Sequence, residues 1–486
     1  MTAPKHYATA PEDRIPFGHK LAYGAGAFVN NLLAAASGGM MIVLNLGLGM
    51  NPALVGLLGA IPRLTDAFTD PVMGYISDNA RTRWGRRRPF IFTGIFVAAI
   101  LFAILWQLPA GKSESFYYWW FLIGSILFYA GYTWWVTPWV ALGYELTPDY
   151  HERTRLMGTQ NFIGQFAYVV SPWFLWIMNS GTFFRNADGE PDQVAGAAGL
   201  AVVIALVTVG LGLLPAIVLR ERMAQVAEAT GRARGLAANA AEFLRGFGIT
   251  LKSGPFRLLC VATFLVFNGF ILISSFASYV IIYYVAGGDQ ELGARWVGLA
   301  GSVGGFSTFA VVAFVTWLAT RIGKRHAFFV SIGVSVVGYA LKWVCYNPDA
   351  PWLVLVPAPL MAFGLGGLFT LVPSMVADVV DTDELHTGER REGMYGSIFW
   401  WTVKLGLSAA LAGSGYLLNA TGFDVALGGE QAARTITLLR LADAGIPAVA
   451  SLVAIWAVWV FPITEARAHE VRAQLEQRRG RAGAAG

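Results

Sequence analysis

Charged residues are scarce in this sequence. Only 13% of its 486 residues are charged, whereas 56% are hydrophobic, and the mean hydropathy is +0.54. A soluble domain of this length needs more charge to stay solvated. Because the apolar excess is spread along the whole chain, it indicates repeated membrane spans and not a single anchor.

Other absences remove whole classes of function. The two cysteines, Cys260 and Cys345, lie in apolar runs and cannot form a disulfide framework, so they do not indicate a redox compartment. The six histidines lie in polar segments without metal-ligand spacing, and no glycine-rich loop could cradle a phosphate. We therefore expect no enzyme, no cofactor and no use of ATP. The segment before Lys20 lacks the features of a cleavable signal peptide, so we expect the first helix to be retained.

Apolar runs long enough to span a membrane recur twelve times, and a long polar gap divides them six and six. The runs lie at 21–48, 52–77, 89–108, 116–145, 155–179, 194–219, 257–285, 293–320, 327–346, 351–377, 394–418 and 434–463. The sequence thus predicts an all-α membrane protein of twelve transmembrane helices in two six-helix bundles. Its expected parts are an N-terminal segment (1–20), a first bundle (21–219), an amphipathic linker (220–256), a second bundle (257–463) and a tail (464–486).

Lysine and arginine predict the orientation. With both termini inside, the inside segments hold 27 of these residues and the outside loops hold 5. Positive charge favours the cytoplasmic side, so both termini, the linker and the tail are expected in the cytoplasm. The basic residues, which give a net charge of +5, are therefore a topology signal and do not indicate nucleic-acid binding.

The two halves carry a faint repeat. The loop after the second span contains Gly85 followed by Arg86, Arg87 and Arg88, and the loop after the eighth span contains Gly323 followed by Lys324 and Arg325. Two related halves are typical of transporters that rock about a central site.

The second span carries three ionisable residues where charge is costly. Arg63, Asp66 and Asp70 are spaced by three and four residues, which places them on one helical face. Two carboxylates about 6 Å apart along a helix axis raise each other's proton affinity or capture a hard cation. We expect a cation-coupling site there. The alternative is that Arg63 only neutralises Asp66 in an inert pair.

Polar residues in other spans have less certain roles. Lys404 lies too deep to reach the interface and could face the carboxylates, whereas Lys342, near the outer end of its span, is expected to snorkel to the interface. Asp378 and Asp381 are expected to cap helices or to pair with the basic loops. Central aromatic rings in the fourth span suit stacking on a sugar or packing against helices, and intramembrane amides suit substrate hydroxyls or neighbouring helices.

The second span and its loop resemble the melibiose permease-like glycoside–pentoside–hexuronide:cation symporter family of the major facilitator superfamily. The matching residues are Arg63, Asp66, Ala67, Asp70, Pro71, Gly74, Arg81, Arg83, Trp84 and Gly85, with Tyr23, Gly24, Gly26, Ala27, Phe28, Thr133, Pro138, Ala377, Asp378, Asp381, Glu392 and Lys404 elsewhere. The resemblance runs along the whole chain in order. It implies the major facilitator fold and symport of a solute with Na⁺ or H⁺ by alternating access.

The resemblance assigns roles unevenly. It implies that Asp66 and Asp70 bind the coupling cation, with Thr133 and Lys404 at or beside the site. Where the family has acidic residues and an arginine that hold a galactoside, this chain has Asn31, Val136 and Asn161. We therefore expect a neutral glycoside or oligosaccharide that binds to these positions together with Tyr129 and Tyr132.

The resemblance leaves other points as expectations. The protein should be a monomer in the inner (plasma) membrane, with the lipid bilayer and a small solute as its partners and with Na⁺ or H⁺ as its coupling ion in place of a cofactor. A gating or conformational role is expected from one set of residues. The set comprises Arg63, Asp78, Arg86, Arg87, Arg88 and Glu145.

Three alternatives stay open. The segment from Gly85 to Ile91 also resembles the same loop of plant-type sucrose transporters, which favours a disaccharide. A vertebrate lysophospholipid transporter has the same fold and helix-two carboxylates, so a lysolipid carrier is a second possibility. The third is a membrane sensor that binds a solute without transporting it.

Overall fold

The computed structural model describes residues 11–147, 150–181, 184, 192–221, 252–388 and 392–483. Within these residues every regular element is helical. The helices are α1 (Phe17–Gly39), α2 (Ile42–Leu46), α3 (Pro52–Asn79), α4 (Arg88–Leu105), α5 (Glu114–Glu145), α6 (Tyr150–Val170), α7 (Phe174–Asn179), α8 (Gln193–Gly212), α9 (Leu214–Val218), α11 (Gly254–Val280), α12 (Gln290–Ile322), α13 (Lys324–Cys345), α14 (Pro357–Thr387), α15 (Glu392–Ala420), α16 (Ala433–Trp459) and α17 (Glu465–Gly483). Most of the expected amphipathic linker lies outside the described residues.

Eight helical segments of the described chain are long and apolar enough to cross a membrane. They are Phe17–Leu46, Arg88–Leu105, Gln193–Val218, Gly254–Val285, Gln290–Ile322, Lys324–Cys345, Pro351–Thr387 and Ala433–Trp459. Four further long helices, α3, α5, α6 and α15, do not pass the same test of apolar length. Of these, α3 carries Arg63, Asp66 and Asp70, and α5 is rich in tryptophan and tyrosine.

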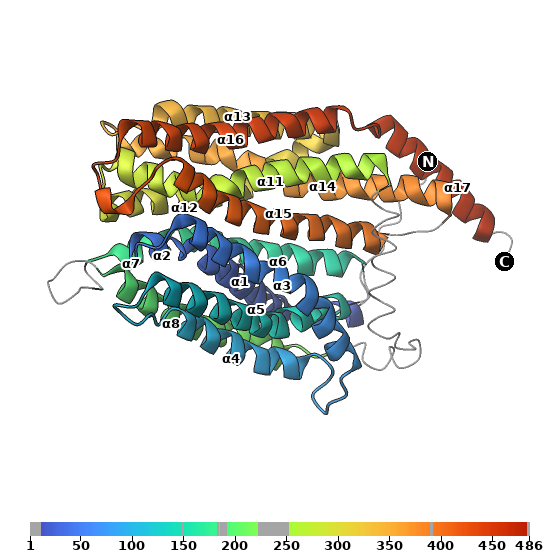
Figure 1. The fold of residues 1–486 in the computed structure, drawn as a ribbon. Helices are drawn as coiled ribbons and strands as arrows, with labels where there is room; N and C mark the ends of the chain where they lie inside the picture. Colours follow the sequence, from blue (N-terminus) through green and yellow to red (C-terminus); the bar gives the residue numbers. More distant parts are fainter. Residues whose placement is uncertain are drawn as a thin grey trace. The chain divides into compact units, whose positions relative to one another are not determined.

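The chain forms two compact units. Unit 1 comprises residues 1–48 and 61–236, and unit 2 comprises residues 49–60 and 237–486. In unit 1, α1 packs along α6 while α4 packs along α5 and α8 (Figure 1).

The packing of α1 against α5 in unit 1 requires a glycine. The rings of Tyr23 and Trp139 stack at 5.1 Å between centroids, and both side chains are fully buried. A Cβ atom on Gly143 would lie 1.9 Å from the hydroxyl oxygen of Tyr23, so only glycine fits there.

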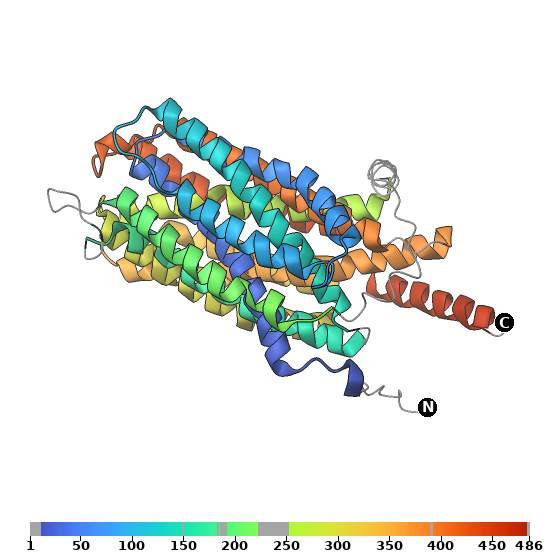
Figure 2. The ribbon, with the colours of Figure 1, turned by 90° about the horizontal axis from the view of Figure 1, so that it is seen from below.

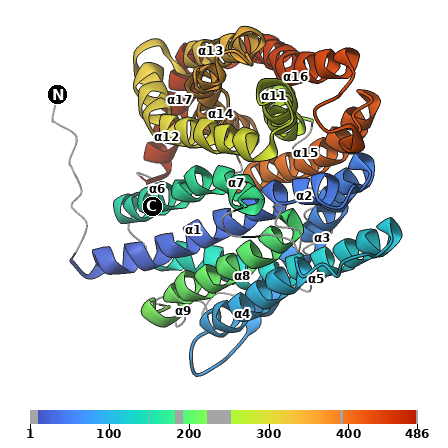
Figure 3. The same cartoon turned by 90° about the vertical axis from the view of Figure 1, so that its left-hand side faces the viewer.

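Unit 2 has its own apolar core. Helix α16 packs along α11 and α13, and α14 packs along α12 and α13, as the view in Figure 3 shows. The core is built from side chains of α11, α12, α13, α14, α15 and α16, among them Phe256, Phe328, Leu368 and Ile398, which are fully buried. Beyond α16 the chain turns into α17, which packs on the end of α14 through Leu385, Val471 and Leu475 (Figure 2).

Candidate functional site

Oxygen atoms of α3 and α5 gather around Asp70. The hydroxyl of Thr133 donates to Asp70 Oδ1 at 3.2 Å, and the hydroxyl of Thr137 donates to the same oxygen at 3.4 Å. The hydroxyl of Thr69 lies 3.3 Å from that of Thr133, which is only 1% exposed. The four-residue spacing of the two α5 threonines places them on one face of that helix. A cluster of oxygen ligands of this kind suits a hard cation or a proton.

Two other charged residues of α3 flank this cluster along the helix. Asp66 lies one turn before Asp70, and its side chain is outside the described residues. The guanidinium carbon of Arg63 lies 4.7 Å from the centroid of the Tyr129 ring, which is a cation–π contact. One face of that ring is therefore occupied by Arg63. Among the described residues, no three histidine, cysteine, aspartate or glutamate side chains form a metal-binding cluster.

A chain of amide hydrogen bonds crosses unit 1 beside the oxygen cluster. The Tyr132 hydroxyl donates to Asn30 Oδ1, and Asn30 Nδ2 donates to Asn31 Oδ1 at 3.0 Å. Asn31 Nδ2 in turn donates to the carbonyl of Gly164 at 3.0 Å. These hydrogen bonds link α5, α1 and α6, so Asn31 uses part of its hydrogen-bonding capacity to hold these helices together.

The remaining expected substrate residues differ in exposure. Asn161 is exposed on α6, whereas Val136 on α5 is half-buried. Tyr129 is 6% exposed. Of the expected substrate residues, Asn161 is thus the most accessible.

The three arginines after Gly85 contact two acidic residues of unit 1. Arg86 Nη2 lies 2.7 Å and Arg87 Nη2 lies 2.9 Å from the same oxygen of Glu145, at the end of α5. Glu145 is one of the two acidic residues in the expected gating set. The side chain of the other, Asp78, lies outside the described residues.

The second acidic residue, Glu221, lies beyond α9 and accepts three backbone hydrogen bonds. The N–H groups of Arg86 and Arg87 donate to its two carboxylate oxygens at 2.8 Å, and that of Arg88 donates at 3.2 Å. These are the unpaired N–H groups that precede and begin α4, where a carboxylate is favourable. Arg88 Nε donates a hydrogen bond of 2.7 Å to the carbonyl of Ala216 in α9.

Gly85 makes the approach of Glu221 possible. Its φ of +103° belongs to a region that side chains other than glycine rarely adopt. A Cβ atom at this position would lie 2.5 Å from a carboxylate oxygen of Glu221. We call this arrangement, Glu221 lying over Gly85 before α4, the carboxylate seat.

Unit 2 contains a counterpart of the carboxylate seat. Gly323, with φ of +80°, precedes α13, and a Cβ atom there would lie 2.5 Å from Oε2 of Glu465, the first residue of α17. Next to it, Lys324 Nζ pairs with Asp378 at 2.7 Å. In unit 1 a carboxylate beyond α8 and α9 covers the glycine before α4. In unit 2 a carboxylate beyond α16 covers the glycine before α13. The expected bridge from Asp378 to a basic loop is confirmed.

The expectation that Lys342 snorkels to the interface is wrong. Its Nζ lies 2.5 Å from Asp443 Oδ1, and the two side chains are 3% and 1% exposed. The partner lies on α16, 101 residues further along the chain, and its carboxylate holds the ammonium inside unit 2. Lys404, the other intramembrane lysine of unit 2, is exposed on α15.

Glu152, ahead of the 155–179 span, anchors the N-terminal segment. It pairs with Lys20 at 2.6 Å and with Arg155 at 3.0 Å, and it accepts the backbone N–H of Ile15 at 3.0 Å. Burial opposes its charge, but these hydrogen bonds outweigh burial and hold the pKa of Glu152 below its ordinary value.

The family model for MFS/sugar transport proteins matches residues 22–465. The chain belongs to this family. It is therefore a multi-pass membrane transporter of the major facilitator fold, and not an enzyme. A solved bacterial homologue of the human lysosomal transporter Spinster, inward-facing, has the same fold. Its TM-score is 0.63, at 13% identity over 95% of this chain and 97% of that one.

Three relatives cover nearly the whole chain. An uncharacterized symporter of Synechocystis sp. is 27% identical over 96% of this chain and 98% of its own length. A glucuronide carrier protein homolog of Escherichia coli is 23% identical over 89% of each chain. A sodium-dependent lysophosphatidylcholine symporter of Gallus gallus is 23% identical over 96% of this chain and 90% of its own.

Sequence reasoning missed several residues that these contacts involve. Glu221 was assigned to the linker, and Asp443 and Thr137 were given no role, whereas Asn30 was expected among the intramembrane amides and does bond to a neighbouring helix. Thr137 had a usable signal, because it follows Thr133 by one helical turn. Glu221 and Asp443 had none, since their partners are more than 100 residues away.

Proposed function

We propose that this protein is a symporter that moves a sugar or glycoside together with Na⁺ or H⁺ by alternating access. The observation that carries the proposal is the oxygen cluster of Asp70, Thr133 and Thr137. Asp66 lies one turn before Asp70 on the same helix, and the resemblance implies that it is the second carboxylate of the cation site. Coupling arises because a cation bound there changes the relative stability of the outward- and inward-open states.

The test is uptake of labelled sugars into proteoliposomes under an imposed Na⁺ or pH gradient. We expect Asp70→Asn and Thr133→Ala to abolish gradient-driven accumulation, while counterflow of the same sugar persists. Asp349→Asn and Thr316→Ala, at exposed positions, serve as matched controls and should behave as the wild type. Normal accumulation by Asp70→Asn would refute this cation site. The resemblance also assigns Lys404 a role in cation coupling, and Lys404→Ala tests that role in the same assay.

The proposed topology has twelve transmembrane helices with both termini in the cytoplasm, in a monomer. The eight apolar segments, together with α3, α5, α6 and α15, account for the twelve. The 27-to-5 distribution of basic residues supports the orientation. Labelling of single cysteines introduced at Ser113 and at Lys324, in intact cells and in inverted vesicles, tests the topology.

Substrate recognition is proposed for Asn31, Tyr129, Tyr132, Val136 and Asn161. An amide both donates to and accepts from sugar hydroxyls, and Val136 offers an apolar wall to a ring face. Substitution of Asn161 by alanine should weaken sugar affinity in counterflow. Unchanged affinity would remove Asn161 from the site.

A gating or conformational role is proposed for Glu221 in addition to the expected set, which comprises Arg63, Asp78, Arg86, Arg87, Arg88 and Glu145. The carboxylate seat fixes the backbone of the arginine loop, which leaves the arginine side chains directed to Glu145 and to α9. We expect alanine variants of these arginines to lose turnover while keeping substrate affinity.

A lysolipid carrier is the second candidate function. The sodium-dependent relative of Gallus gallus, similar along almost the full chain, is the observation that favours it. Counterflow of labelled lysophosphatidylcholine in the same proteoliposomes separates the two candidates. The sodium dependence of that relative also makes Na⁺ the first cation to test.

A further inference from the structure

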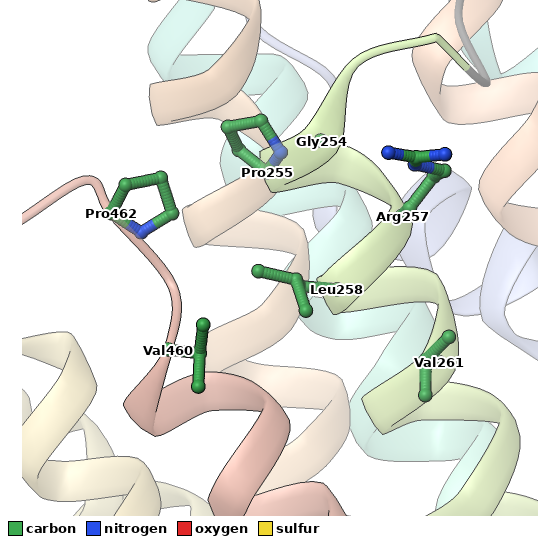
Figure 4. A pocket seen from close by; sticks show the side chains of 7 residues that line it. All are labelled: Gly254, Pro255, Arg257, Leu258, Val261, Val460 and Pro462. Carbon is green, nitrogen blue, oxygen red and sulfur yellow. The ribbon is translucent and has the colours of Figure 1, made fainter.

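An open groove lies on unit 2 where the first turns of α11 meet the end of α16 (Figure 4). The groove has a volume of about 530 Å³ and is open to its surroundings. Its walls are apolar except for one arginine, Arg257. The apolar lining comes from Gly254, Pro255, Leu258, Val261, Val460 and Pro462.

Two cationic residues lie around the start of α11. Arg257 is exposed in the first turn of α11, and Lys252 is exposed just before that helix. The first turn of α11 contains no acidic residue, so no local carboxylate neutralises Arg257 from its own helix. Arg325 does not line the groove, and it donates a hydrogen bond to the carbonyl of Trp459 at the end of α16. Arg257 is therefore the cation that lines the groove itself.

The groove lies at one end of an apolar segment that is long enough to cross a membrane. The apolar segment Gly254–Val285 begins at the groove, so Arg257 lies at the end of a span. Leu258 and Val261 follow on the same face of α11, and Val261 lies about 10 Å further along the axis than Gly254. Val261 and Val460 are 46% and 48% exposed, which leaves an apolar track below the arginine.

We propose that this groove binds one anionic phospholipid of the cytoplasmic leaflet. The headgroup phosphate pairs with the Arg257 guanidinium, and an acyl chain lies along Leu258, Val261 and Val460. Basic pockets at the cytoplasmic ends of helices bind anionic headgroups, and guanidinium holds phosphate in a bidentate geometry. The site is separate from the oxygen cluster, and it rests on the cytoplasmic orientation proposed above.

The test is native mass spectrometry of the purified full-length protein, delipidated and then mixed with phosphatidylglycerol or phosphatidylcholine. The wild type should retain one phosphatidylglycerol in preference to phosphatidylcholine. Arg257→Ala should weaken phosphatidylglycerol binding about fivefold, as expected for one basic residue at an anionic surface, and Arg257→Lys should restore part of it. Val261→Trp, which fills the track, should weaken binding of both lipids.

Arg321→Ala is the matched control, because Arg321 is also an exposed arginine at the end of a long helix of unit 2. It should leave binding unchanged. An equal loss in Arg321→Ala would overturn the proposal in favour of a diffuse surface charge. The proposal also fails if the wild type does not prefer the anionic lipid, or if inorganic phosphate alone displaces it fully.

Discussion

Replacing Lys342 by methionine removes the cationic member of the buried ion pair in unit 2. Methionine has a similar length and packs well in an apolar core, so the change is mainly one of charge. Asp443 is then left 1% exposed without its partner. Breaking a buried pair in this way costs about 3–5 kcal/mol, because the remaining charge has lost both water and its counterion. Asp443→Leu should cost a similar amount.

The double variant Lys342→Met/Asp443→Leu removes both charges. It should recover most of the loss, since replacement of a buried pair by apolar residues is often neutral or stabilising. The difference between the double variant and the sum of the single variants is the coupling energy of the pair.

The assay is thermal unfolding of the purified full-length protein in detergent at one heating rate. For a unit of about 260 residues the shift is about 2 °C per kcal/mol, so each single variant should melt about 6–10 °C below the wild type. Lys324→Met is the control, because its pair with Asp378 has side chains 38% and 20% exposed. An exposed pair contributes about 0–1 kcal/mol, so the control should melt within about 2 °C of the wild type. Single Lys342 or Asp443 variants as stable as the wild type would refute the reasoning.

Three further predictions concern unit 1. Glu221→Gln keeps a hydrogen-bond acceptor but loses the charge-assisted bonds, so it should lower turnover severalfold at unchanged sugar affinity. Gly85→Ala, which clashes with Glu221, should lower turnover at least as much. Wild-type turnover in both variants would contradict the carboxylate seat. Asn31→Ala should lower stability by about 1 kcal/mol, measured as a melting temperature, whereas Asn161→Ala should not. Folding lowers the pKa of Glu152, so its contribution to stability is fully present above the unfolded pKa and is lost as the pH falls through the folded pKa. Glu152→Gln should therefore melt at a lower temperature than the wild type at pH 7, and the two melting temperatures should converge in acid.

Spans could be predicted from the sequence because hydropathy is a local property. The runs expected at 257–285 and 293–320 appear as Gly254–Val285 and Gln290–Ile322. The shifts of about three residues arise at caps. Asp289, for example, accepts the N–H of Leu292 and starts α12 earlier than its apolar run.

The pairing of distant charges could not be predicted in the same way. Lys342 near the end of an apolar run suggests snorkelling, and only the three-dimensional position of Asp443 on α16 shows that the lysine points inward. Glu221 likewise looks like one more charge of a polar linker. The Asp70 cluster was accessible from sequence because its members lie on helical faces with regular spacing, although the contact between α3 and α5 still required the fold.

The carboxylate seats bear on how the chain could be divided into two polypeptides. Glu221 is the last described residue before the segment 222–251, and Glu465 lies far downstream in unit 2. A break within that segment therefore leaves each fragment with its own glycine and its own covering carboxylate. The first fragment also keeps α4 and α8, and the second keeps α13 and α16, which are the helices that the two carboxylates connect. Residues 1–236 and 237–486, expressed as separate genes in one cell, should thus reconstitute a working transporter without a covalent connection.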